Sequence, residues 1–128
     1  MTISELVAQS HQMAVEKGFT VPGTPTDIPR SLMLVVSELS EALEEVRSGH
    51  APATVYTKPT VQVPRDLDPR FKDTPLPPAK PEGFGVELAD AVIRIAHLCG
   101  ALDIDLEARV VEKLTYNATR PYKHGRAF

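Results

Sequence analysis

An almost uninterrupted apolar helix that carries two carboxylates is the strongest constraint on how this chain folds. Residues 84–99, FGVELADAVIRIAHLC, are expected to be helical and buried nearly all round. One apolar stripe, at about 100° per residue, comprises Leu88, Val92, Ile95 and Cys99. Glu87, Asp90 and Arg94 follow one another at i, i+3 and i+7 and interrupt this surface on one side. Because a buried carboxylate is normally paired or bound to a metal, a cation is expected against Glu87 and Asp90.

A second helix, residues 31–47, carries a matching set of acids. Its predicted apolar face comprises Leu32, Val36, Leu39, Leu43 and Val46. Glu38, Glu41 and Glu45 line a flank of the same helix, where like charges at these spacings repel one another. If the two helices pack antiparallel, E-x-x-E and E-x-x-D bring four oxygen ligands together. Such a set is typical of a Mg²⁺ or Mn²⁺ site.

The remaining pattern predicts an all-α fold in a single domain, residues 1–128, of ordinary size. The low aromatic content also favours helices over a β-sandwich. Two further helices are expected, over residues 3–17, ending at Gly18, and over residues 106–118. The apolar helix described above is expected to run from about residue 83 to 98 and to end at Gly100. Thr2 or Ser4, Asp27 with Pro29, and Asp103 or Asp105 are the expected start signals. The last helix is expected to bury Leu106, Val110 and Leu114.

Residues 49–82 form a long proline-rich insert between the two acidic helices. They hold eight of the twelve prolines, which excludes a helix. The alternation in ATVYTKPTVQV, residues 53–63, indicates a short edge hairpin with Val55, Val61 and Val63 on one side.

Charge and composition exclude several classes of protein. The net charge of −3 gives no reason to expect binding to a nucleic acid polymer. No apolar run approaches the length of a membrane span, and the first residues do not resemble a signal peptide, so a cytoplasmic protein without a membrane partner is expected. The single cysteine excludes an internal disulfide, and a di-iron centre is disfavoured because neither acidic motif contains histidine.

The C-terminal part of the chain, with a tail at residues 119–128, gathers donors suited to phosphate. They comprise Lys113, Tyr116, Asn117, Arg120 and Lys123. A carboxylate cluster with Mg²⁺ beside such a basic arm suits chemistry on a polyphosphate, in which carboxylates also orient or deprotonate water. His11, beside the end of the first helix, is either a surface imidazole or helps to hold a planar ligand.

Three ordered motifs resemble a known family. They are SELSEALEE at 37–45, VELADAVIRI at 86–95 and EKLTYNATRPYKHG at 112–125. Together they resemble the MazG-like all-α nucleoside triphosphate pyrophosphohydrolases. The resemblance implies a four-helix bundle completed by dimerisation, as a homodimer or homotetramer. It also implies Mg²⁺-dependent cleavage of an NTP or dNTP to the monophosphate and pyrophosphate, consistent with house-cleaning of nucleotide pools.

The resemblance also assigns roles to residues. Glu38, Glu41, Glu87 and Asp90 would be the metal ligands, with Glu38 and Glu41 the catalytic carboxylates. Lys113 and Asn117 would face the phosphates or the sugar, and Tyr116, Arg120 and Lys123 are further candidates from the same motif. His11, from its position beside the end of the first helix, is added as a candidate for substrate binding.

Two departures from the family pattern leave alternatives open. The family often shows E-E-x-x-E, but the first position here is Ser37, with Glu44 or Glu45 as candidate replacements. The insert is also much longer than usual. One alternative is a non-catalytic regulator of the same fold that binds a nucleotide or a partner. Another is a structural helical dimer whose acids form salt bridges with Arg94, Lys113 and Arg120.

Overall fold

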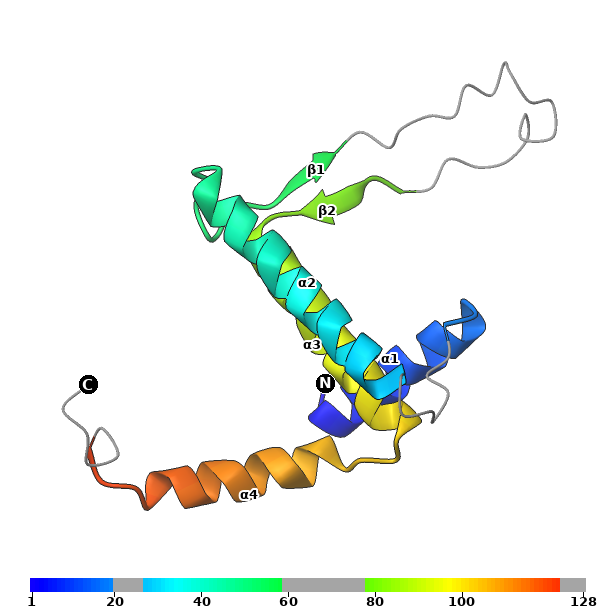
Figure 1. Cartoon of the computed structure of the whole chain (residues 1–128), viewed down its shortest axis with the longest axis vertical. Helices are drawn as coiled ribbons and strands as arrows, with labels where there is room; N and C mark the ends of the chain where they lie inside the picture. The colour runs from blue at the N-terminus through cyan, green and yellow to red at the C-terminus, as the bar shows by residue number, and fades with distance from the viewer. Residues whose placement is uncertain (20–26, 59–77, 123–128) are drawn as a thin grey trace. The chain divides into compact units, whose positions relative to one another are not determined.

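The computed structural model describes residues 1–19, 27–58 and 78–122, and these residues are mostly helical (Figure 1). The prediction of an all-α fold is confirmed in this respect. Four helices and two short strands follow one another in the described residues: α1 (Ile3–Glu16), α2 (Asp27–Arg47), β1 (Tyr56–Lys58), β2 (Lys80–Glu82), α3 (Phe84–Ala101) and α4 (Leu106–Ala118). The predicted roles of Lys123, Val61 and Val63 fall outside the described residues.

Several helix ends follow the predicted capping signals. The Thr2 side chain accepts a hydrogen bond from the Glu5 amide, and Glu5 accepts one from the Thr2 amide, which completes a capping box. α2 begins at Asp27, and Asp105 caps α4 by accepting a hydrogen bond from the Ala108 amide at 2.9 Å. Gly18 follows α1 with a φ of +80°. Local side-chain chemistry therefore sets these boundaries.

The chain divides into two compact units, and each is described by itself. The first unit contains residues 1–35 and 91–128, and the second contains residues 36–90. In the first unit, α1 contacts α4, where both the amide and the hydroxyl of Ser4 donate to Glu107 at 2.8 and 2.7 Å. The second unit contains the two strands and the acidic segments of α2 and α3, which run antiparallel (Figure 1).

The predicted end of the third helix at Gly100 is wrong, because α3 continues to Ala101. A Cβ added at Gly100 would lie 2.7 Å from the Cβ of His11, so this glycine lets α1 approach α3 closely. The glycine is therefore required by packing between helices of the first unit and does not end the helix.

The predicted apolar face of α2 is exposed, contrary to its expected burial. All five of its members are at least 46% exposed: Leu32, Val36, Leu39, Leu43 and Val46. The buried positions of α2 are instead Val35, Glu38 and Ala42. Leu114 of α4 is also exposed, and four large apolar residues of α3 are too: Leu88, Val92, Ile93 and Ile95. The buried apolar residues of the described part are mostly small, with Leu98 the largest of them, and most of the large apolar side chains of α2 and α3 are exposed.

A two-stranded antiparallel ladder joins the ends of the proline-rich insert. Tyr56 pairs with Glu82, Thr57 with Pro81, and Lys58 with Lys80. A strand was therefore correctly expected near residue 56. In the described residues its partner is β2, from the far end of the insert. The predicted pairing with residues 60–63 lies outside the described residues. The ladder leads directly into the first turn of α3.

Substitution of Gly83 by alanine is expected to destabilise the protein, whereas substitution of Gly85 is not. Gly83 has a φ of +130°, and an added Cβ would collide with the carbonyl oxygen of Thr54. Backbone strain alone costs about 1–3 kcal/mol. Gly85 lies in α3 with open space around its Cβ position, so alanine there is neutral or slightly stabilising. Thermal unfolding of both variants measures the difference, and equal melting temperatures would contradict it.

Candidate metal centre

Three carboxylates of the second unit converge on one point. Glu38 and Glu41 of α2 and Glu87 of α3 each offer one oxygen, and these oxygens lie within 4.8 Å of one another. Glu38 is 6% and Glu87 only 1% exposed, whereas Glu41 is open to solvent. Three of the four predicted metal ligands are thus brought together. The arrangement suits a cation that is reached from the side of Glu41.

Glu87 is the most unusual of these groups. Among the described residues it is the largest side chain that is fully buried, and its Oε2 atom has no hydrogen-bond partner. Burial raises the pKa of its carboxyl group, and Lys80 opposes this rise. A hydrogen bond with Glu82 and the charge of Glu41 raise the pKa further. An acid in such surroundings binds either a proton or a cation.

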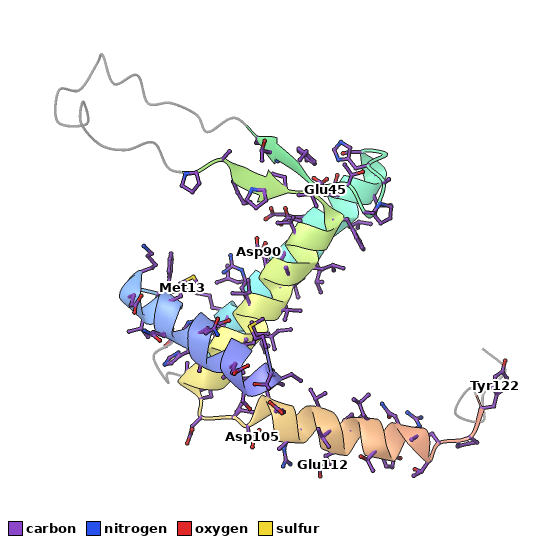
Figure 2. The ribbon with its side chains drawn as sticks, turned by 180° about the vertical axis from the view of Figure 1, so that it is seen from behind. Met13, Glu45, Asp90, Asp105, Glu112 and Tyr122 are labelled. Atoms are coloured by element: carbon purple, nitrogen blue, oxygen red, sulfur yellow. The ribbon has the colours of Figure 1, made fainter. Side chains whose placement is uncertain are left out.

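Asp90 is not part of the converging group, although it was predicted as the fourth ligand. It lies one turn after Glu87 on α3 and is half-buried (Figure 2). The charge of Asp90 contributes to the raised pKa of Lys80, after the hydrogen bond and charge of Glu82 and the charge of Glu87. Asp90 therefore belongs to the same electrostatic neighbourhood without lying among the three close oxygens.

The ladder supplies a third buried carboxylate, Glu82, which sequence reasoning missed. Its side chain is 8% exposed and forms ion pairs with Lys80 at 3.3 Å and Lys58 at 3.4 Å. Burial favours the neutral acid, but hydrogen bonds from both lysines outweigh it and lower the pKa of Glu82. The sequence did contain one indication of this ion pair, the segment Lys80-Pro-Glu82 just before the acidic helix. Lys80 pairs with Glu82 and acts on Glu87 only through its charge.

The two candidate replacements for the acid absent at Ser37 have other partners. Glu45 accepts a hydrogen bond from the Tyr56 hydroxyl at 2.9 Å and lies 2.7 Å from Nδ1 of His50 (Figure 2). The bond with His50, followed by that with Tyr56, lowers the pKa of Glu45. Glu44 is exposed and pairs with Arg47 at 3.2 Å. Glu45 therefore links β1, through the Tyr56 hydroxyl, to the end of α2.

The predicted substrate-binding residues of the first unit occupy an exposed stretch of α4. Lys113 lies with its Nζ 5.0 Å from the centre of the Tyr116 ring. Both line a shallow, open depression with Arg109 and Glu112. Asn117 and Arg120 are exposed on the following turn. This surface presents positive charge and an aromatic face, but none of its side chains is buried.

His11, the remaining predicted ligand of the substrate, packs within the first unit. Its ring stacks on His97 of α3 with centroids 5.3 Å apart, and the two Nδ1 atoms lie 3.3 Å apart. Burial, and then the charge of His11, lowers the pKa of His97. In this structure the planar partner of His11 is thus another histidine of the same chain.

Comparison with known proteins adds no assignment. No family model, curated protein or solved structure matches the chain. Within the described residues, no helix combines the length and the apolar character needed to cross a membrane. The functional argument therefore depends on the chemistry of the carboxylates themselves.

Proposed function

We propose that this protein is a Mg²⁺-dependent nucleoside triphosphate pyrophosphohydrolase, which cleaves an NTP or dNTP to the monophosphate and pyrophosphate. The observation that carries the proposal is the buried Oε2 of Glu87, which has no partner beside two further carboxylates. A purely structural cluster of this kind would be costly, because unpaired buried acids destabilise a fold. A divalent cation offsets that cost and provides a reason for the cluster to exist.

The donor set fits Mg²⁺ or Mn²⁺. Glu38, Glu41 and Glu87 provide hard oxygen ligands, and Asp90 is the adjacent candidate for a fourth. When bound, the cation neutralises phosphate oxygens and makes an attacking water more acidic. Glu41, the exposed member of the cluster, is the side chain placed to orient or deprotonate that water. Lys113, Tyr116, Asn117 and Arg120 are the candidates for contact with the nucleotide.

A homodimer or higher homo-oligomer is part of the proposal. Five exposed apolar residues of α2, from Leu32 to Val46, lie at the spacing of one helical face, and Met33 and Leu34 are exposed beside them. Val111 and Leu114 of α4 are exposed as well. Faces of this kind occur where a partner covers them. A second copy of the chain would complete the helical bundle that the sequence motifs imply.

Release of pyrophosphate from a panel of NTPs and dNTPs tests the proposal. We expect release by the wild type with Mg²⁺, none with EDTA, and a loss of at least a hundredfold for Glu41→Ala. Glu44→Ala, which removes an exposed acid from the same helix, is expected to retain activity. Release that survives both EDTA and Glu41→Ala would contradict the proposed site. Absence of release from every nucleotide would favour a non-catalytic regulator of the same fold.

A further inference from the structure

The lysines of the β1–β2 ladder have no part in the function proposed above. Lys58 and Lys80 are directly opposite each other in the register, and both bind Glu82. Like charges directly opposite in an antiparallel pair destabilise a ladder. Two positive charges meet a single negative charge on Glu82, so one charge of this trio is not balanced within it.

The exposure of the trio is uneven. Glu82 is 8% exposed, whereas the side chains of Lys58 and Lys80 are 60% and 58% exposed. An ammonium group has three donors, and Glu82 offers one carboxylate oxygen to each lysine. Glu82 is therefore the buried member of the trio. The remaining donors of both lysines are accessible from solvent.

The trio adjoins the candidate metal centre. β2 ends at Glu82, and the Glu87 amide donates to the carbonyl oxygen of the next residue, Gly83, at 3.1 Å, so the end of the ladder lies against the first turn of α3. Glu82 and Lys80 both act electrostatically on Glu87. Glu87, Glu82 and both lysines belong to the same unit of the chain. A cation at the carboxylates would neutralise the acids that now attract Lys80, which would leave the lysines as an exposed positive surface at the edge of the centre.

We propose that Lys58 and Lys80 bind the polyphosphate chain of the ligand, with buried Glu82 holding both ammonium groups at the edge of the metal centre. This inference rests on the proposed function, because the polyphosphate is expected there only if the carboxylates hold a divalent cation. Ammonium groups are common phosphate ligands and contact its oxygens as point charges. The insert is thereby given a role in binding, through the two residues that its ladder places at the site.

Calorimetric titration with inorganic tripolyphosphate in the presence of Mg²⁺ tests the assignment. We expect Lys58→Gln and Lys80→Gln each to weaken binding about tenfold, as for loss of one hydrogen bond to a charged group. Lys58→Arg and Lys80→Arg keep the charge and are expected to bind within about threefold of the wild type. Arg47→Gln removes an exposed positive charge from α2 and is the control, with no expected change. Wild-type affinity in both glutamine variants, or no binding of tripolyphosphate by the wild type, would overturn the proposal.

Two further measurements separate this test from that of the proposed function. Because Glu82 is left without its partners when both lysines are replaced, the triple variant Lys58→Gln, Lys80→Gln, Glu82→Gln is included. It is expected to fold, with tripolyphosphate binding weakened at least tenfold; wild-type affinity there would also overturn the proposal. Mn²⁺ titration without phosphate reports on the carboxylates alone and is expected to change less than twofold in each single glutamine variant. Binding of tripolyphosphate that depends on the lysines, without release of pyrophosphate from any nucleotide, would support this inference and contradict the proposed hydrolase.

Discussion

Glu87→Gln is expected to abolish stabilisation of the protein by Mg²⁺ and to stabilise the cation-free form at neutral pH. At a Mg²⁺ concentration a hundred times the dissociation constant, binding stabilises the wild type by about 2.7 kcal/mol. For a chain of this size that corresponds to a rise in melting temperature of about 10 °C. Glutamine has nearly the same shape but cannot become an anionic ligand, so the rise is expected to disappear. Thermal unfolding with Mg²⁺ and with EDTA measures both effects.

The pH dependence of the same variant follows from the raised pKa of Glu87. Below 4.5, the ordinary pKa of a glutamate, the carboxyl group is protonated in both the folded and the unfolded chain. As the pH rises from 4.5 through the raised pKa, the unfolded chain loses its proton first, so the folded state is destabilised in that window. Glu87→Gln lacks this contribution, and its stability relative to the wild type is expected to grow over the same window in EDTA.

Glu44→Gln is the matched control, since Glu44 is exposed on α2 and pairs only with nearby Arg47 in the described ion pairs. It is expected to show the same Mg²⁺-dependent rise as the wild type. A rise of equal size in Glu87→Gln would remove Glu87 from the metal centre. A wild type whose melting temperature is the same in Mg²⁺ and in EDTA would contradict the centre as a whole.

The double variant Leu39→Glu, Leu43→Glu is expected to convert the protein from a homo-oligomer to a monomer. Leu39 and Leu43 are 47% and 55% exposed and lie one turn apart on α2. Loss of two buried leucines costs about 2–5 kcal/mol each. The introduced charges would also be desolvated at the interface. Together these effects correspond to a loss of association of at least a thousandfold.

Light scattering coupled to size-exclusion chromatography measures the mass of each variant at micromolar concentration. Val55→Glu is the control, because Val55 is exposed near the strands and outside the apolar face of α2. It is expected to keep the oligomeric state of the wild type. A monomeric wild type, or a double variant that stays associated, would contradict the proposed interface.

The local part of the fold could be predicted from the sequence, because capping and helix periodicity act over a few residues. The limits of α4 are correct for this reason. Asp27 was named as a start signal, but the second helix was expected over residues 31–47, and α2 is already helical at Asp27. The convergence of Glu38 and Glu41 with Glu87 also follows from spacing, once the two helices are taken as antiparallel. These features depend on the spacing of residues within a helix and on one assumption, that α2 and α3 run antiparallel.

The features that were missed depend on contacts between distant residues. Pairing of Tyr56 with Glu82 brings together two ends of a long insert, and no local pattern records it. Periodicity identified the large apolar face of α2 but could not tell whether this chain or another chain covers it. Lys58 and Lys80 were missed because they come together only through their ion pairs with Glu82. Those ion pairs exist only when the ladder is formed.

Because of the register of the ladder, the positions of Lys58 and Lys80 do not depend on the length of the insert between them. Lys58 and Lys80 face each other at the rung where the chain leaves and re-enters the ladder. Residues 59–79 can therefore be lengthened, shortened or exchanged in the course of evolution while both lysines keep their places. Under the proposed function, such an arrangement would give one metal centre a variable segment through which new ligand preferences can be acquired.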